Sequence, residues 1–297
     1  MNVEVAGVEL REPTLLASGI LGSTGASLER VLDAGAGGVV TKSVGPEPRE
    51  GHPGPNVFTE DGYALNAVGL SNPSKEYSGE LEDVDGTVVV SVFGGTAEEF
   101  ADLAETFSPY ADAVELNVSC PHAEGYGTDI GADPELTYEV TEAAVEAASV
   151  PVWTKLTPNV TDVVEIGRAA EDAGASAVTA VNTLAAMAVD VESARPILGN
   201  VHGGLSGSAL KPVAVRCVYD LYEALEVPVV GVGGVGGPED ALEMMLAGAS
   251  AVQIGTAVKD GVEVFEDVAE GVDDYCSRHG LSHGELVGLA HDRGVAE

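Results

Sequence analysis

A group of nucleophilic and hydrogen-bonding side chains follows a short apolar segment in the stretch VELNVSCPH, residues 114–122. The group contains Asn117, Ser119, Cys120 and His122. A thiolate can act as a nucleophile or a base, and an amide side chain both donates and accepts hydrogen bonds. A strand that ends in such a group is either followed by a capped loop or forms part of an active site.

Two lysines stand at comparable positions. Lys42 and Lys155 close the apolar runs VVTK and VWTK, and they are two of only five lysines in the chain. A surface position is the ordinary alternative for a lysine. At the end of a buried strand, however, the side chain would point into the mouth of a barrel, where catalytic groups gather. We therefore expect both ammonium groups to lie in a functional site.

Glycines follow two later apolar runs, in VGVGGVGGPEDA and VQIGTAV. Gly233 and Gly234 precede a predicted helix, and Gly255 precedes Thr256. Glycine lets the backbone approach a phosphate closely, and helix N-termini in such loops commonly bind one. Tight turns are the alternative for each site alone. Together the sites favour a phosphorylated ligand, and a neighbouring cation suits flavin mononucleotide (FMN).

Metal ligands are not apparent in the sequence. Cys120, Cys217 and Cys276 are far apart and form neither a disulfide framework nor a CxxC pair. The histidines are scattered, and no carboxylate stands at a predicted strand end. We therefore predict free thiols and no metal, with Cys217 as a small core residue.

The chemistry-bearing residues are positioned by short apolar runs, most of them followed by a segment with helical spacing. Near-continuous apolar runs are typical of strands buried on both faces, as in parallel sheets. Eight of them predict an α/β fold, a (β/α)8 TIM barrel, with a doubly wound open sheet as the alternative. The runs are 14–17, 38–42, 87–92, 112–117, 151–156, 176–181, 228–232 and 251–255.

The predicted barrel occupies residues 1–297 as a single domain, with an N-terminal hairpin in VEVAGVELRE. The two long connections, residues 43–86 and 183–227, are expected to be functional because loops of this length usually are. Since barrel active sites lie at the carboxyl ends of the strands, the residues found there should converge. They are Ser18, Gly19, Lys42, Ser43, Asn117, Cys120, Lys155, Asn182, Thr183, Gly233, Gly234, Gly255 and Thr256.

The composition is strongly acidic, with 49 Asp and Glu against 13 Lys and Arg and a net charge of −36. Such a field repels nucleic acid and anionic membranes. The acidic residues are spread over the predicted helices, which argues against an acidic tail and suggests a halophilic source. The sequence shows neither an apolar run of about 18 residues nor a signal peptide, so we expect a cytoplasmic protein.

These motifs, in this order, resemble the class 1 dihydroorotate dehydrogenases. Those enzymes are FMN-containing barrels that oxidise dihydroorotate to orotate in pyrimidine biosynthesis. The resemblance runs nearly from end to end, and within the family it is closest to the archaeal, 1B-like type. It is carried by LLASGI, VVTKSV, NAVGLSNP, ELNVSCPH, KLTPN, VNT, GGLSGSALKPVAVR, GVGGV and AVQIGTAV.

The resemblance implies specific roles. Cys120 would be the catalytic base, assisted by Lys42, which would contact both cofactor and substrate. The FMN contacts would be Ser18, Lys42, Ser43, Asn117, Lys155, Val181, Gly207, Gly233, Gly234, Gly255 and Thr256. The residues lining the orotate site would be Lys42, Asn66, Ala67, Val68, Gly69, Leu70, Asn117, Asn182 and Thr183.

The resemblance also implies a partner. Class 1B enzymes pass electrons to NAD through a separate subunit that carries FAD and an iron–sulfur cluster. This chain has neither cluster-spaced cysteines nor a GxGxxG after a strand, so such a subunit would be a different chain. We expect a homodimer or a heterotetramer, with a fumarate-reducing class 1A homodimer still open.

One position departs from the family pattern. His122 stands where many family members have an Asn, and the similar barrel of dihydropyrimidine dehydrogenase has a His at the matching place. A dihydropyrimidine dehydrogenase-like subunit acting on uracil or thymine is therefore one alternative. An alternative of another class is a flavin-free phosphate-binding barrel that acts as a lyase or isomerase.

Overall fold

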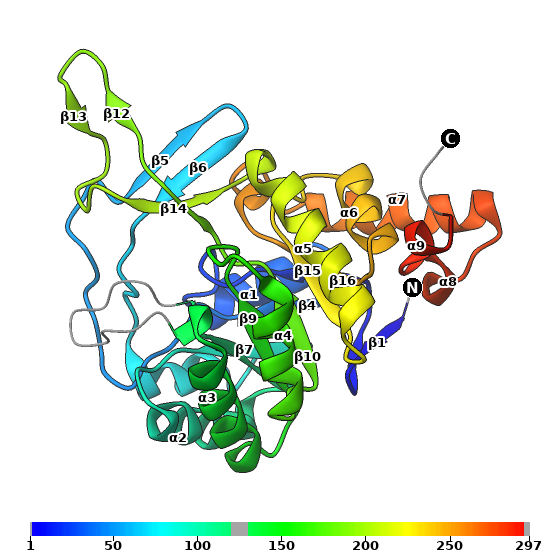
Figure 1. The fold of residues 1–297 in the computed structure, drawn as a ribbon, viewed down its shortest axis with the longest axis horizontal. Coiled ribbons are helices and arrows are strands. Elements are labelled where there is room, and N and C mark those ends of the chain that lie inside the picture. Colours follow the sequence, from blue (N-terminus) through cyan, green and yellow to red (C-terminus); the bar gives the residue numbers. More distant parts are fainter. Residues whose placement is uncertain (1, 120–129, 294–297) are drawn as a thin grey trace.

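Eight parallel strands close into a barrel in the computed structural model, which describes residues 2–119 and 130–293 (Figure 1). Each barrel strand pairs with the next one along the chain, and the last pairs with the first. The strands are β3 (Thr14–Leu16), β4 (Gly38–Val40), β7 (Val88–Val92), β8 (Ala113–Asn117), β9 (Val152–Leu156), β10 (Ala177–Ala180), β15 (Val229–Val232) and β16 (Ala249–Ile254). The predicted TIM barrel is confirmed, and each predicted run corresponds to one of these strands. The single-domain boundaries stay a prediction.

Amphipathic helices cover the outside of the barrel. Five of the α-helices begin at an N-cap whose side chain accepts a backbone N–H: Thr24, Thr96, Asp133, Asp162 and Ser282. The α-helices are α1 (Gly25–Asp33), α2 (Ala97–Phe107), α3 (Pro134–Ala147), α4 (Val163–Asp172), α5 (Lys211–Ala224), α6 (Pro238–Leu246), α7 (Val264–His279), α8 (His283–Leu286) and α9 (Leu289–Arg293). Short 3-10 helices are η1 (Ser74–Glu80), η2 (Ser108–Tyr110), η3 (Ile130–Ala132), η4 (Ser208–Leu210) and η5 (Thr256–Lys259). Cys217 is buried in α5, as predicted, and Cys276 is buried in α7.

The amino-terminal end of the barrel is closed by the predicted hairpin, β1 (Val3–Val5) and β2 (Val8–Leu10). Its strands alternate between buried and exposed residues, so each places two apolar side chains in the core. These pack in one cluster with one residue from every barrel strand, which we call the floor cluster. Its barrel members are Leu15, Val40, Val89, Ala113, Trp153, Ala177, Val230 and Ala251.

The two long connections form an arm beyond the opposite end of the barrel (Figure 1). Strands β5 (Val57–Glu60) and β6 (Tyr63–Asn66) come from the first connection, and β11 (Leu184–Ala186) and β14 (Gly203–Ser206) from the second. They make one sheet in the order β11-β14-β6-β5. A smaller hairpin, β12 (Val189–Asp190) and β13 (Arg195–Pro196), extends it. The connections predicted to be functional are therefore joined to each other.

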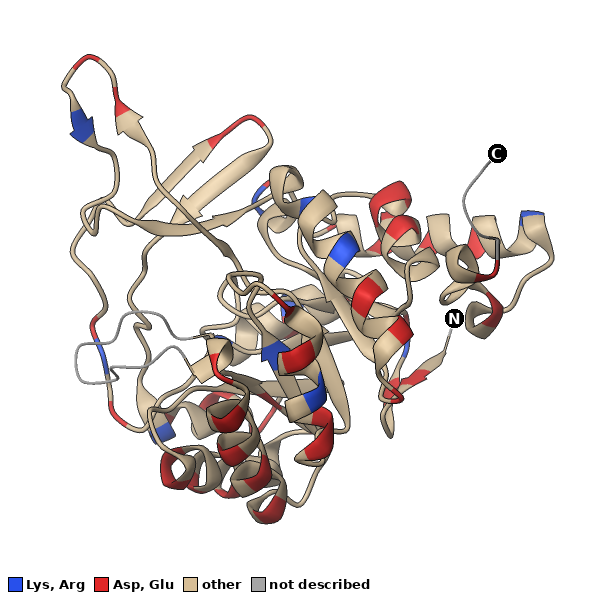
Figure 2. Cartoon of the chain, viewed as in Figure 1, with Lys and Arg blue, Asp and Glu red and all other residues tan. Residues whose placement is uncertain are grey.

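Acidic residues are spread over the helices that surround the barrel, among them α2, α3, α6 and α7 (Figure 2). This agrees with the predicted spread over helical segments, whereas the halophilic source stays a prediction. Within residues 2–119 and 130–293, no helix is long and apolar enough to cross a membrane.

Candidate active site

The interior of the barrel changes from apolar to polar two residues beyond the floor cluster. Side chains alternate along a strand, so residues two apart face the same side. Counting two residues on from each floor residue gives Ala17, Lys42, Ser91, Glu115, Lys155, Thr179, Val232 and Gln253. Six of these eight are polar, so we call them the polar layer. The mouth, the carboxyl-terminal end of the strands, lies directly beyond it.

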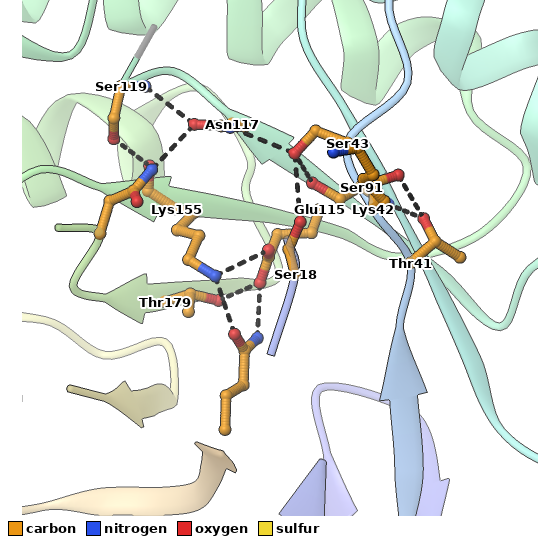
Figure 3. Close-up of polar contacts among 12 residues, drawn as sticks. Ser18, Thr41, Lys42, Ser43, Ser91, Glu115, Asn117, Ser119, Lys155 and Thr179 are labelled. Atoms are coloured by element: carbon orange, nitrogen blue, oxygen red, sulfur yellow. Dashed lines mark hydrogen bonds and ion pairs between the residues drawn. The ribbon is translucent and has the colours of Figure 1, made fainter. Parts of the chain in front are cut away.

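Four members of the polar layer form a closed set of contacts, which we call the Glu115 network (Figure 3). The Lys155 ammonium lies 3.3 Å from Oε1 of Glu115 and donates to Oε1 of Gln253 at 2.9 Å. The other carboxylate oxygen of Glu115 accepts hydrogen bonds from Nε2 of Gln253 at 2.6 Å and from the Thr179 hydroxyl at 3.0 Å. Glu115 is 0% exposed and Lys155 4%. This buried charge pair is therefore hydrogen-bonded on both sides.

Glu115 and Gln253 were not predicted as site residues, because they lie inside β8 and β16 and not at the strand ends where functional side chains were expected. A weak indication was available. Glu115 stands two residues before Asn117 in an otherwise apolar strand, so both side chains had to face the same side.

The two lysines, treated alike from the sequence, differ in the structure. Lys155 is buried and ion-paired, whereas Lys42 is half-buried and has no ion-pair partner among the residues that the structure describes. Burial lowers the pKa of Lys42 below its ordinary value. Lys42 borders a cavity of about 290 Å³, whose other lining residues are Ser23, Ser43, Val44, Arg49, Ser71, Asn72, Pro73 and Tyr77. A basic residue without a partner beside a cavity is suited to meeting an anionic ligand.

A chain of hydrogen bonds runs across the mouth (Figure 3). Ser43 Oγ lies 3.1 Å from Ser18 Oγ and 2.9 Å from Ser91 Oγ, and it accepts from Nδ2 of Asn117 at 3.2 Å. Asn182 Nδ2 donates to Oδ1 of Asn117 at 3.1 Å. The structure thus brings together four of the predicted contact residues, Ser18, Ser43, Asn117 and Asn182, from strand ends far apart in the sequence.

The predicted substrate segment, residues 66–70, connects the arm to the mouth. Asn66 donates to the carbonyl of Gly204 at 3.4 Å. Gly204 in turn packs closely against Thr183, since a Cβ added to this glycine would lie 2.1 Å from the Thr183 hydroxyl oxygen. The Thr183 N–H donates to Oδ1 of Asn182 at 2.8 Å. At the other end of the segment, the Leu70 carbonyl accepts from Nδ2 of Asn72, which borders the Lys42 cavity. Ala67, Val68 and Gly69 lie between these two anchors.

The predicted glycine cradle also assembles. Gly207 and Gly234 have φ angles of +91° and +80°, which glycine adopts without steric cost, and a Cβ on Gly234 would lie 3.0 Å from the Gly207 carbonyl oxygen. A Cβ on Gly233, at φ +132°, would lie 2.8 Å from Ala214. Nearby, the Thr256 hydroxyl donates to Ser206, the residue before Gly207.

Packing against the protein alone requires glycine at Gly233 and Gly234. A backbone without side chains in these loops also suits a phosphate-bearing cofactor, because it leaves N–H groups open to close approach. The remaining two predicted contacts stand at strand ends. Gly255 directly follows β16, and the N–H of Val181, which follows β10, donates to Val232. The cofactor roles of all these residues stay predictions.

Cys120 and His122 lie outside the described residues. Ser119, the residue before Cys120, is connected to the mouth at two points. Its N–H donates to Oδ1 of Asn117 at 3.3 Å, and its hydroxyl donates to the Lys155 carbonyl at 3.4 Å. Within residues 2–119 and 130–293, no group of three or more His, Cys, Asp or Glu side chains could hold a metal ion.

Comparison with known proteins agrees with this geometry. The family model for dihydroorotate dehydrogenase matches residues 1–275. The chain is 54% identical to the catalytic subunit of dihydroorotate dehydrogenase B (NAD(+)) of Methanosarcina mazei, over 97% of this chain and 94% of that protein. The proteins of the same name from Methanocella arvoryzae and Pyrococcus abyssi are 54% and 50% identical, over 98% of this chain and 98% and 99% of theirs. The chain therefore belongs to the dihydroorotate dehydrogenase family and groups with its B-type catalytic subunits.

Proposed function

We propose that this protein is the catalytic subunit of an NAD-linked dihydroorotate dehydrogenase, which oxidises (S)-dihydroorotate to orotate in de novo pyrimidine biosynthesis. Its family and its similarity to B-type catalytic subunits support this assignment. The structural observation that carries it is the mouth. There Lys42, a half-buried lysine without an ion-pair partner among the described residues, directly precedes Ser43 in the sequence. Ser43 is hydrogen-bonded to the amide of Asn117, which is hydrogen-bonded in turn to the amide of Asn182.

Members of this family are flavoenzymes, and we propose FMN as the particular flavin. The bound flavin supplies the acceptor for a hydride. The residues proposed to hold it are Ser18, Lys42, Ser43, Asn117, Lys155, Val181, Gly207, Gly233, Gly234, Gly255 and Thr256. Glycines in the loops after β15 and β16, Gly233, Gly234 and Gly255, support this choice, because glycine lets a backbone approach a phosphate closely.

The substrate combines a carboxylate with a ring of amide donors and acceptors. The Lys42 ammonium can pair with the carboxylate, and the two mouth asparagines offer both hydrogen-bond donors and acceptors to the ring. We propose that Asn66, Ala67, Val68, Gly69, Leu70 and Thr183 complete the substrate site. Oxidation removes a proton and a hydride from neighbouring carbons, and Cys120 is proposed from the sequence as the base that takes the proton.

Electrons must leave the barrel after each turnover. The relatives are named as catalytic subunits of NAD(+)-linked enzymes, which implies a separate electron-transfer subunit. We propose that this subunit carries FAD and an iron–sulfur cluster and that the assembly is a heterotetramer, with a homodimer of this chain as its core.

The test is an anaerobic visible spectrum of the FMN-loaded protein in concentrated KCl, recorded before and after addition of dihydroorotate or dihydrouracil. Bleaching by dihydroorotate alone is expected. Bleaching by dihydrouracil alone would contradict the substrate, and a folded protein that takes up no flavin would contradict the function itself. Lys42→Met is the matched variant. Because Lys42 is proposed to pair with the substrate carboxylate, this change should raise the dihydroorotate concentration needed for bleaching when the flavin content of the two proteins is matched.

A further inference from the structure

Glu115 is a charged residue that the proposed reaction does not use. Its carboxylate is fully buried inside the barrel, and no step of the chemistry above requires it. Burying a carboxylate costs free energy unless the charge is paired and its oxygens are hydrogen-bonded. Two residues earlier along each strand, on the same inward-facing side, the floor cluster fills the barrel with apolar side chains. Packing alone therefore gives no reason for a carboxylate at this position.

The contacts of Glu115 determine how Lys155 is held. One oxygen lies against the Lys155 ammonium at 3.3 Å, and the other accepts from the amide nitrogen of Gln253 at 2.6 Å. A carboxylate can only accept hydrogen bonds, so it must face the NH2 group of Gln253. The amide oxygen then faces Lys155, at 2.9 Å from its nitrogen. Glu115 thus contacts the lysine directly and orients its second partner.

Lys155 lies directly below the mouth. Its backbone carbonyl accepts from the hydroxyl of Ser119, which also contacts the mouth residue Asn117. A cation beside a flavin stabilises the extra negative charge of the reduced ring, so it favours reduction. A carboxylate next to that cation offsets part of its charge and weakens the effect.

We propose that Glu115 is a positioning residue that fixes Lys155 and offsets its charge, and that it thereby sets the reduction potential of the bound flavin. The proposal rests on the proposed function, in which Lys155 contacts the flavin. It assigns a role to a buried pair that acts on the cofactor without contacting the substrate.

The test is a redox titration of the FMN-loaded wild type and Glu115→Gln, an exchange that keeps the shape of the side chain and removes its charge. The variant should shift the two-electron equilibrium toward reduced flavin by about tenfold, which corresponds to about 30 mV. Glu146→Gln, the same exchange at an exposed site on α3, should leave the equilibrium unchanged. Lys155→Met should shift it in the opposite direction, toward oxidised flavin.

A purely structural role would lower the melting temperature or the flavin affinity of Glu115→Gln and leave the potential unchanged, and that result would overturn the proposal. Glu115→Asp provides a second measurement if the Gln variant does not fold. It keeps the charge but withdraws it from Lys155, so a smaller shift toward reduced flavin is expected, and no shift would again overturn the proposal. Both failures occur in a protein that dihydroorotate still bleaches, so they are distinct from failure of the proposed function.

Discussion

The floor and the polar layer of this barrel are built by the same eight strands, yet they have opposite chemistry. The barrel residues of the floor cluster are all apolar. Of the eight residues that stand two positions further along the strands and face the same side, six are polar. Strand alternation places both sets inside the barrel. The difference teaches that one apolar layer, together with the helix-covered outer face, is enough to close this barrel. The next layer is then available for chemistry.

The outer face explains how the polar layer is tolerated. The larger of the two apolar clusters lies between the strands and their covering helices, and it includes Leu16, Val90, Leu116 and Leu156. These residues alternate with the inward-facing ones along the same strands. Each buried aliphatic side chain contributes about 1.5–3 kcal/mol. We therefore expect stability to depend mainly on this outer core and on the floor, and activity to depend on the polar layer and the mouth.

The largest effect is expected from Cys120→Ala, which changes the residue proposed from the sequence as the base. If Cys120 is the base, the rate of flavin reduction by dihydroorotate should fall by about 10²–10⁴-fold, the usual contribution of a general base. Stopped-flow spectroscopy measures this rate. The melting temperature should change little if the residue serves only the chemistry. An unaltered rate would remove Cys120 from the mechanism.

The floor is tested by Trp153→Ala. Trp153 is fully buried in the floor cluster, so its truncation should lower the free energy of unfolding by about 3–5 kcal/mol. Denaturant titration at constant salt measures the change. Val191→Ala in the arm is the control, because Val191 is 85% exposed and should cost less than about 0.5 kcal/mol. Similar losses in the two variants would show that the floor is not a stabilising layer.

A smaller effect is expected from Asn117→Ala, which removes hydrogen bonds to Ser43 and from Asn182. Leaving these partners unpaired costs about 1–3 kcal/mol, so the affinity for FMN or dihydroorotate should fall by about tenfold or more. Fluorescence titration of the flavin measures the affinity for FMN. The dependence of bleaching on substrate concentration measures the affinity for dihydroorotate. Asn200→Ala, in the arm, is the matched control. Equal affinities for Asn117→Ala and wild type would mean that the mouth chain does not contact either ligand.

The smallest expected effect is the pH dependence of the free energy of unfolding that comes from the titration of Lys42. Because burial lowers the pKa of Lys42, the unfolded chain holds this proton up to higher pH than the folded protein. Between the lowered pKa and the ordinary value of 10.5, the unfolded state binds more protons, so the stability of the wild type rises with pH. Lys42→Met lacks this titration.

The Met variant should therefore be the more stable protein at neutral pH, and its advantage should shrink as the pH approaches 10.5. Chemical denaturation of both proteins at a series of pH values measures the difference. A constant difference at all pH values would contradict the desolvation of Lys42. The variant should also lose affinity for dihydroorotate, which would show that this lysine is kept for function at a cost in stability.

Much of the fold follows from local patterns. The eight strands and the N-terminal hairpin were predicted because apolar runs of the right length, and their alternation, are visible in single segments. The convergence of Ser18, Ser43, Asn117 and Asn182 was predictable for one further reason. The carboxyl ends of parallel strands meet at one end of a closed barrel, so residues at those ends have to meet as well.

The Glu115 network could not be predicted in this way. Its contacts join residues 40, 98 and 138 positions apart, and they depend on the register in which the strands close. The difference between the two lysines has the same origin, since VVTK and VWTK are nearly identical as sequences. Lys155 pairs with a residue on the neighbouring strand β8, and Lys42 meets no such residue in the described part of the chain.

The sequence by itself determined the number of barrel strands, their inward and outward faces, the acidic outer helices and the set of groups available at the mouth. These are properties of residue type and spacing, and the backbone periodicity converts them directly into structure. Only the tertiary structure decided which charges are paired, which lysine stays available for a ligand, and which strands of the two long connections join into the arm. Those outcomes depend on contacts between distant segments, and such contacts exist only once barrel closure has set the register.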